Sequence, residues 1–295
     1  MKKRVLLLGA HGMEGHVLNL VLREHDQDFE VMSVARDSGK LSADISLDVT
    51  NFSELTKLIQ QSSFDVIINC IGILNKTAED NPDLAVLINA YLPHFLEAQT
   101  KNTSCKVIHI STDCVFSGGK GNYNEKDFKD GKGFYAQSKA LGEIENEKDL
   151  TIRTSIIGPE LKSNGIGLFH WFMNQTGEIK GFEKAIWSGV TTLQLARSIV
   201  NMLQQQKLTG LVHLTNNQPI SKYDLLLLIQ RIFAKSDVVI ISDTNYSVDK
   251  SIINTRKDFD PQIPSYEQML VELRQWMEKH SHLYNYTLTA TAHSV

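Results

Sequence analysis

A glycine spacing near the N-terminus is suited to binding a nucleotide diphosphate. Gly9, Gly12 and Gly15 follow the apolar run RVLLL and precede HVLNLVLREH, in which apolar residues recur at helical intervals. In a strand, turn and helix unit of this kind, the first glycine permits a tight turn. The second lets the backbone approach phosphate, and the third lets the helix pack closely on the sheet. Free N–H groups at the helix N-terminus favour an anion, so this context favours a cofactor site over an ordinary glycine-rich loop.

A second spacing is suited to proton transfer. Tyr135 and Lys139 lie four residues apart in YAQSK, so on a helix both side chains project from one face. A free tyrosine has a pKa of about 10, and a neighbouring cation such as Lys139 would favour its phenolate near neutral pH. An ordinary surface pair is the alternative, but the segment STD at 111–113, which ends an apolar strand, makes that less probable. Together the two spacings predict a nicotinamide-dependent oxidoreductase.

Bulk properties agree with an enzyme in the cytoplasm. A net charge of −4 over 295 residues gives no electrostatic reason to expect nucleic acid or an anionic membrane as a partner. We expect no membrane association, because no apolar run approaches the roughly 18 to 20 residues that a transmembrane helix needs. Cys70, Cys105 and Cys114 are odd in number and lack metal-ligand spacing, so we expect reduced thiols and no metal site.

Strand-like and helical segments alternate up to about residue 157, which predicts an α/β fold with a Rossmann-type doubly wound parallel sheet. We expect residues 1–157 to form an NAD(P)-binding domain, completed by about 186–215 and part of 250–258. Beyond residue 157 the alternation becomes irregular. Residues 158–185 and 216–280 are therefore expected to form a smaller C-terminal substrate-binding lobe, and residues 281–295, which lack helical periodicity and charge, a C-terminal tail.

Five further motifs carry a family resemblance. They are NCIG at 69–72, STDCVFSG at 111–118, GNYNEKD at 121–127, YAQSK at 135–139 and IRTSIIGP at 152–159. In this order, and after the glycine motif, they resemble the extended short-chain dehydrogenase/reductases. The resemblance is greatest to the dTDP-4-dehydrorhamnose reductase-like sugar-nucleotide reductases, and it covers almost the whole chain. It implies reduction of a 4-keto sugar nucleotide by NAD(P)H.

The resemblance also implies roles for the catalytic residues. Tyr135 would protonate the keto oxygen as hydride arrives, and Lys139 would also hold the nicotinamide ribose. A hydroxyl must fix the substrate oxygen, and Thr112 at the end of the VIHIST strand matches that position, with Ser111 less probable. Asn89 lies where relatives carry a helix-interrupting asparagine near the tyrosine, although a solvent-facing asparagine is the alternative.

The cofactor contacts implied by the resemblance begin at the glycine turn and end at the catalytic pair. They are Gly9, His11, Gly12, Met13, Gly15, Arg36, Asp48, Val49, Cys70, Ile71, Gly72, Tyr135 and Lys139. Asp48 would accept from the adenine amino group, or it is only an acid at a helix N-terminus. At the tip of the second strand Arg36 precedes Asp37 and no acid stands at Ala35, so NADP(H) is favoured and NAD(H) is possible. A solvated loop cation is the alternative for Arg36.

The substrate contacts implied by the resemblance lie after the catalytic strand and in the later segments. They are Asp113, Val115, Phe116, Asn164 and Trp187. Trp187 would stack on a pyrimidine or sugar, while Trp171 is as well explained as a core residue. The segment KAIWSGVTT departs from the rhamnose-pathway enzymes, which tend to have a proline-containing loop there. A UDP-linked 4-keto-6-deoxy-N-acetylhexosamine is therefore as reasonable a substrate as dTDP-4-dehydrorhamnose, in either case for cell-surface polysaccharide synthesis.

Two other readings of the same fold stay open. One is a sugar-nucleotide epimerase or dehydratase that retains NAD. The other is a non-catalytic regulatory subunit, like that of methionine adenosyltransferase, against which the set of Thr112, Tyr135 and Lys139 argues. A homodimer is possible, and the sequence does not decide the oligomeric state.

Overall fold

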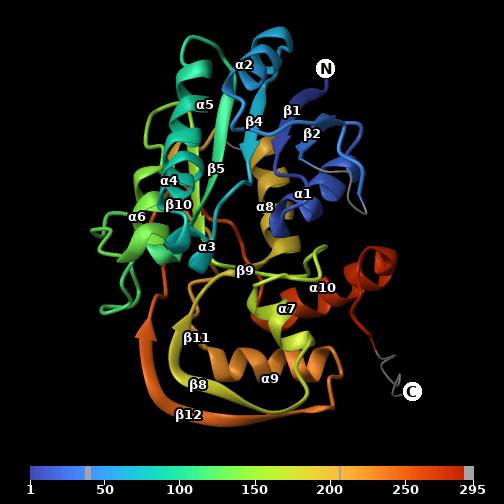
Figure 1. The fold of residues 1–295 in the computed structure, drawn as a ribbon, viewed down its shortest axis with the longest axis vertical. Coiled ribbons are helices and arrows are strands. Elements are labelled where there is room, and N and C mark those ends of the chain that lie inside the picture. The colour runs from blue at the N-terminus through green and yellow to red at the C-terminus, as the bar shows by residue number, and fades with distance from the viewer. Residues whose placement is uncertain (37–40, 206, 289–295) are drawn as a thin grey trace.

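A seven-stranded parallel sheet forms the centre of the protein in a computed structural model that describes residues 1–36, 41–205 and 207–288. The strand order is β10-β6-β5-β4-β1-β2-β3 (Figure 1). The strands are β1 Lys3–Leu8, β2 Phe29–Ala35, β3 Ile45–Ser46, β4 Val66–Asn69, β5 Lys106–Thr112, β6 Leu150–Thr154 and β10 Gly210–His213. The order reverses between β1 and β4, where the chain crosses from one half of the sheet to the other, so the predicted Rossmann-type fold class is confirmed.

Helices cover both faces of this sheet, because the side chains of its strands alternate between two apolar cores. Val5 and Leu7 of β1 pack into the core that α1 and α8 cover, whereas Leu6 and Leu8 pack into the core under α2 and α5. The elements along the faces are α1 Met13–Glu24, α2 Phe52–Gln61, α3 Asn75–Asp80, α4 Pro82–Ala85, the π-helix η1 Val86–Tyr91, α5 Leu92–Thr100, the 3₁₀ turn η2 Asp113–Val115, α6 Gly133–Leu141 and α8 Thr192–Gln205.

A second, smaller sheet lies beside the carboxyl ends of the central strands (Figure 1). Its order is β11-β8-β12, with strands β8 Gly177–Trp187, β11 Ile220–Ser221 and β12 Val238–Asp249. Its neighbours are the helices α7 Leu168–Met173, α9 Lys222–Ile232 and α10 Tyr266–Lys279 and the strand pair β7 Ile156–Ile157 with β9 Val190–Thr191. The division of the chain into two domains at the residues given above stays a prediction. None of the described helices is long and apolar enough to cross a membrane.

The segment from residue 281 begins as packed structure and is not a tail as far as residue 288. Ser281–Leu283 forms the 3₁₀ turn η3, and Leu283 and Tyr284 are buried. The hydroxyl of Tyr286 accepts from the backbone N–H of Glu160 at 3.0 Å and lies 2.7 Å from Nδ1 of His170. Aromatic side chains thus give this uncharged segment enough apolar area and enough polar partners to order it.

Candidate active site

The glycine turn between β1 and α1 has room only for glycine at two positions. Gly9 adopts φ +90°, and a Cβ there would lie 2.8 Å from Cγ1 of Ile71. A Cβ on Gly15 would lie 2.0 Å from the carbonyl oxygen of Gly9. Gly12 is the N-cap residue of α1 and donates to the Gly9 oxygen at 2.9 Å. The turn therefore brings backbone of β1, α1 and the end of β4 into close contact at a helix N-terminus, where phosphate can bind.

Two polar side chains of this turn have buried atoms that lack a partner among the described residues. They are His11, through Nε2, and Glu14 in the first turn of α1, through both carboxyl oxygens. Burial raises the pKa of Glu14 well above its usual range, so this carboxyl is a neutral acid that would not repel a phosphate. Unsatisfied buried groups of this kind are rare in folded proteins. A polar dinucleotide fits the turn because it would supply the missing partners.

The strand tip next to the turn carries the residues expected at the adenosine end of a cofactor. Arg36 is exposed directly after β2, and its charge helps to lower the pKa of Asp48, mainly set by hydrogen bonds from Thr50. The Asp48 carboxylate accepts from the N–H of Thr50 at 3.0 Å and from its hydroxyl at 2.8 Å. Val49 is buried, and Asp37 lies outside the described residues. Arg36 and Asp48 are thus within electrostatic reach of each other.

The predicted catalytic residue Tyr135 lies in the first turn of α6. Glu79 of α3 accepts from the backbone N–H groups of Phe134 and Tyr135, each at 3.1 Å, and so caps the free N–H groups at that helix end. Burial raises the pKa of Tyr135, as do the Cys114 thiol and the Asp113 carboxyl, while a hydrogen bond with Thr112 acts in the opposite direction. Before any ligand binds, the Tyr135 phenol is therefore a neutral acid with a proton to give.

Lys139 is buried one helical turn after Tyr135, and its amine contacts β5. Nζ donates to the carbonyl oxygen of Ile110 at 2.7 Å and lies 3.2 Å from Nε2 of His109. Burial lowers the pKa of Lys139 to about 8, although the charges of Glu143 and Cys70 act to raise it. Burial also raises the pKa of Tyr135, so in the ligand-free protein the phenol is neutral, and the effect of Lys139 on the phenolate stays a prediction.

The two adjacent hydroxyls at the end of β5 point to different partners. Thr112 hydrogen-bonds with Tyr135 and its oxygen also accepts from the N–H of Cys114 at 3.1 Å. Ser111 donates to the carboxylate of Glu143 at 2.7 Å, which in turn forms a buried ion pair with Arg153 at 2.6 Å. Residues at successive strand positions face opposite sides, so the structure joins Thr112 and not Ser111 to the tyrosine.

Asn89 hydrogen-bonds both to the segment after β4 and to α6, the helix that carries Tyr135. It is fully buried in the π-helix η1, so the solvent-facing alternative is wrong. Its amide accepts from the N–H of Ile73 and donates to the Ile73 carbonyl, each at 2.8 Å, and it also donates to the Ser138 hydroxyl at 3.1 Å. The segment after β4, which contains Cys70, Ile71 and Gly72, is thereby fixed against α6.

Three predicted substrate contacts face the core and need correction. Val115 and Phe116 are fully buried, and Phe116 stacks on Tyr123 with ring centroids 4.1 Å apart. Trp187 is also buried, donating through its indole N–H to the Ser155 hydroxyl at 2.7 Å and packing on Tyr266. These side chains fill apolar space beneath the site and cannot stack on a substrate.

The other predicted substrate residues lie at the site or on the surface. Asp113 is buried directly after Thr112, and burial raises the pKa of its carboxyl while the charges of Lys250 and Lys222 lower it. Asn164 is exposed in the loop before α7. In the same loop, Gly167 lies against the end of the Met13 side chain, so this loop reaches the start of α1. Trp171, given equal weight as a core residue, is 39% exposed.

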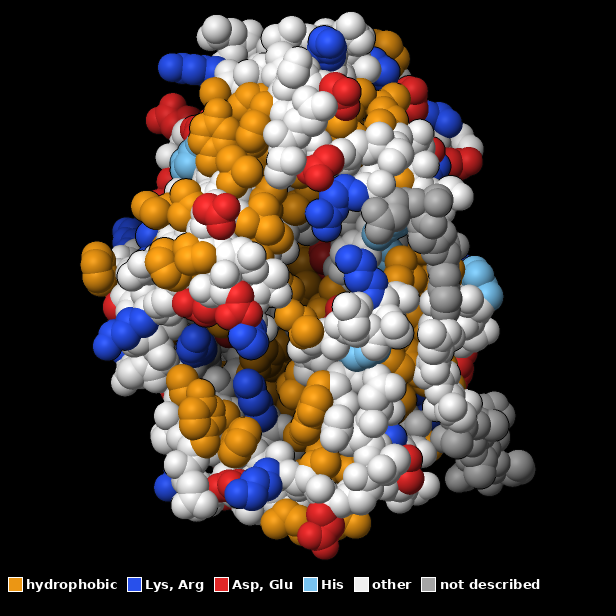
Figure 2. Space-filling model, in the orientation of Figure 1, with side chains coloured by type: hydrophobic (Ala, Val, Ile, Leu, Met, Phe, Trp, Pro, Cys, Tyr) orange, Lys and Arg blue, Asp and Glu red, His pale blue; other side chains and the backbone are white. Residues whose placement is uncertain are grey.

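Figure 2 shows a hollow between the part of the molecule built on the central sheet and the part built on the smaller sheet. Apolar side chains line it, and Lys or Arg side chains border it. A hollow outside the carboxyl ends of parallel strands, beside the point where the strand order reverses, is where α/β proteins bind ligands.

Sequence reasoning missed the residues that hold the glycine turn from behind. His16 of α1 places Nδ1 2.8 Å from the Gly12 carbonyl oxygen and Nε2 2.8 Å from the Tyr284 hydroxyl. Because a carbonyl can only accept, Nδ1 donates and Nε2 accepts from the tyrosine. Burial lowers the pKa of His16 to about 4, which keeps it neutral. The tyrosines in the segment from residue 281 were the feature of the sequence that could have indicated this contact.

The fold and the motifs of the chain are those of a known protein family. A family model described as the RmlD substrate binding domain matches residues 2–250, so the chain belongs to the RmlD substrate binding domain family.

Individual relatives agree with this assignment. The spore coat polysaccharide biosynthesis protein SpsK of Bacillus subtilis is 24% identical over 227 residues, 75% of this chain and 76% of that protein. A dTDP-4-dehydrorhamnose reductase of Mycobacterium tuberculosis is 28% identical over 147 residues, which is 48% of this chain but only 44% of that reductase. The crystal structure of dTDP-4-dehydrorhamnose reductase from Bacillus anthracis in complex with NADP has a TM-score of 0.76 at 24% identity, covering 94% of this chain and 100% of that one. That last likeness shows the fold.

Proposed function

We propose that the protein reduces the 4-keto group of a nucleotide-linked 4-keto-6-deoxy sugar with NAD(P)H. The observation that carries this proposal is the contact of Thr112 with a half-buried, neutral Tyr135 one helical turn before Lys139. The site fits the cofactor because His11 and Glu14 leave buried polar atoms unpartnered at the glycine turn. When bound, the dihydronicotinamide supplies a hydride to the substrate carbonyl.

The residues of the chain have separate roles in this proposal. The Tyr135 phenol donates its proton to the keto oxygen, and the Thr112 hydroxyl holds that oxygen by a second hydrogen bond. Lys139 in its protonated form stabilises the phenolate that the proton transfer leaves behind. Asp113 orients Thr112, whose hydroxyl lies 3.1 Å from a carboxyl oxygen of that aspartate.

NADPH is the proposed hydride source, with NADH as a weaker substitute. The support is the exposed Arg36 at the tip of β2, because a guanidinium can bind a 2′-phosphate through two hydrogen bonds. The similar Bacillus anthracis structure is a complex with NADP. Asp48 and Val49 would lie at the adenine and Met13 at the pyrophosphate.

The nucleotide on the sugar is proposed as dTDP or UDP. The relatives named as dTDP-4-dehydrorhamnose reductases support the first, and the departure of the segment KAIWSGVTT from those enzymes supports the second. The name of the Bacillus subtilis relative agrees with a product used in cell-surface polysaccharide.

The direct test supplies the product of a 4,6-dehydratase acting on dTDP-glucose or on UDP-N-acetylglucosamine, together with NADPH, and follows the loss of dihydronicotinamide absorbance. We expect one equivalent of NADPH consumed per sugar nucleotide. Conversion of the sugar without NADPH consumption, by protein that keeps NAD through dialysis, would instead identify an epimerase or dehydratase. No conversion of either substrate would contradict the proposal.

A further inference from the structure

A buried chain of three side chains ends on the Lys139 amine. Asn69 at the end of β4 and His109 on β5 are register partners on adjacent parallel strands and both are fully buried. Nδ2 of Asn69 lies 3.2 Å from Nδ1 of His109, and Nε2 of His109 lies 3.2 Å from Nζ of Lys139. Lys139 is 4% exposed, so water does not compete with these contacts.

A backbone contact fixes the donor and acceptor direction of these side-chain hydrogen bonds. The N–H of Ile71 donates to Oδ1 of Asn69 at 3.1 Å, so the amide NH₂ of Asn69 must face His109. An NH₂ group only donates, and Nδ1 of His109 therefore accepts. Burial and the neighbouring Lys139 hold the pKa of His109 well below its usual range, so the ring is neutral and carries its one proton on Nε2.

That proton points at the Lys139 amine. A neutral amine has a lone pair that can accept the Nε2–H, whereas an ammonium has none and would set two N–H groups against each other. The remaining contact of Nζ, to the Ile110 carbonyl oxygen at 2.7 Å, suits either form because both donate. The other ionisable groups that face the amine are Glu143, in the segment after α6, and Cys70 after β4, and both favour the ammonium.

We propose that Asn69 acts through His109 as a positioning residue that controls the protonation of the Lys139 amine. The inference deepens the proposed function and, for its catalytic meaning, rests on it. In the reaction, the cation that stabilises the Tyr135 phenolate would then be lost just above neutral pH. The fall of kcat/KM at alkaline pH would thus depend on Asn69, which acts through His109 and Lys139 and does not itself touch the reacting atoms.

Replacing the Asn69 amide by a carboxylate reverses the direction of the hydrogen bonds from residue 69 through His109 to Lys139. In Asn69→Asp both side-chain oxygens accept, so the Ile71 N–H keeps its partner and Nδ1 of His109 becomes the donor. The lone pair of Nε2 then faces Lys139 and favours the ammonium. In His109→Phe an aromatic ring remains, but it has no N–H to oppose the cation. Both variants should raise the pKa of Lys139, and in the double variant Asn69→Asp should add little, because its effect passes through the missing imidazole.

The test measures the Lys139 titration in the cofactor-free protein, from the Cε chemical shift of ¹³C-labelled lysine, with the resonance assigned by its loss in Lys139→Met. We expect a midpoint near 8 in the parent protein. Each single variant should move it up by about one unit or more. A parent midpoint near the ordinary value of about 10.4, or an unmoved midpoint in Asn69→Asp, would overturn the inference.

The double variant separates the two possible causes. A carboxylate at residue 69 could also act on Lys139 directly through its charge. If Asn69→Asp raised the pKa by the same amount with and without His109, the effect would be direct and the relay would be disproved. Since this titration needs no substrate, its failure leaves the proposed reaction untouched, and failure of the proposed reaction leaves the titration result intact. Thermal unfolding of each variant confirms that the comparison is made on folded protein.

Discussion

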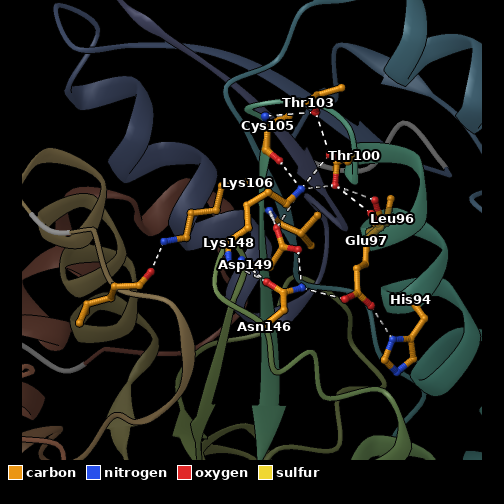
Figure 3. A network of polar contacts seen from close by, with 12 residues as sticks. His94, Leu96, Glu97, Thr100, Thr103, Cys105, Lys106, Asn146, Lys148 and Asp149 are labelled. Carbon is orange, nitrogen blue, oxygen red and sulfur yellow. Dashed lines mark hydrogen bonds and ion pairs between the residues drawn. The ribbon is translucent and has the colours of Figure 1, made fainter.

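Two polar clusters at opposite ends of the central sheet differ in how well their hydrogen-bonding groups are satisfied. At the amino end of β5, Lys148 donates to the Thr100 carbonyl and hydroxyl oxygens, each at 2.9 Å, and to the Cys105 carbonyl at 2.8 Å (Figure 3). Asn146 bridges Glu97 and Asp149 in the same network. At the carboxyl end of β1, Glu14 and His11 are buried with polar atoms that no described residue satisfies.

This difference in hydrogen bonding distinguishes a cluster that stabilises the fold from one that is suited to binding a ligand. A network whose donors and acceptors are matched stabilises the folded chain by itself, whereas buried groups without partners cost free energy until a ligand binds. From the state of their hydrogen bonds we infer that the glycine turn, and not the Lys148 network, binds a ligand.

The largest effect is expected on turnover, from Tyr135→Phe. The variant loses the proton donor and keeps the ring, so kcat should fall by about 10²- to 10⁴-fold while the dissociation constant of NADPH changes little. Tyr123→Phe is the matched control, because Tyr123 is a buried tyrosine that stacks on Phe116 and makes no contact with Thr112. Steady-state kinetics of both variants decide the matter, and near-normal turnover of Tyr135→Phe would remove this residue from the acid role.

The next effect is on stability, from Lys148→Met. Loss of hydrogen bonds from a cation to three acceptors should lower the free energy of unfolding by roughly 2 to 3 kcal/mol and leave NADPH affinity unchanged. Lys101→Met gives the control, since Lys101 is exposed and is the C-cap residue of α5, next to the Thr100 that Lys148 contacts. Urea unfolding and a binding titration together test the contrast. A loss of NADPH affinity in Lys148→Met without a loss of folding stability would contradict the contrast between the two regions.

Glu14→Leu should change stability with the opposite sign. Removing an unsatisfied carboxyl should raise the free energy of unfolding of the cofactor-free protein by roughly 1 to 2 kcal/mol and weaken NADPH binding. The folded-state pKa of Glu14 is raised, so in the parent the folded state binds the proton more tightly and stability falls as pH rises above the unfolded pKa. The gain from leucine should therefore grow with pH from about 4.3 upward. A destabilised variant would show that Glu14 has a structural partner after all.

The smallest effect is expected on cofactor choice, from Arg36→Ala. Loss of the guanidinium should weaken NADPH binding and leave NADH nearly unaffected, so the ratio of kcat/KM for the two cofactors should fall by about tenfold, or about 1.4 kcal/mol. Arg23→Ala is the comparison, because that arginine is engaged by Asp44. An unmoved ratio would make Arg36 a solvated loop cation.

The fold was predictable because periodicity and glycine placement act locally. The run RVLLL alternates between two cores, as β1 does, and the glycines of the turn have no room for a Cβ. The spacing of four puts Tyr135 and Lys139 on one helix face, whereas the pairing of Thr112 with Tyr135 was predicted from the family resemblance of the strand end.

Other parts depended on packing that a sequence does not state. Resemblance placed Trp187 and Phe116 along the chain but not the direction in which their side chains point, and both face inward. Likewise, nothing local shows that the Lys139 amine contacts His109, because that contact depends on how α6 lies over β5. Tyr284 orders the terminal segment through His16, which is 268 residues away in the chain.

The most direct test of the account follows a hydrogen atom. The protein is incubated with NADPH carrying deuterium at the transferred position of the nicotinamide and with the 4-keto sugar nucleotide, and the product is examined by mass spectrometry and NMR. We predict one deuterium, bound to C4 of the sugar, for each NADPH consumed, and almost no labelled product from Tyr135→Phe. A changed sugar without deuterium at C4 would contradict a 4-keto reductase.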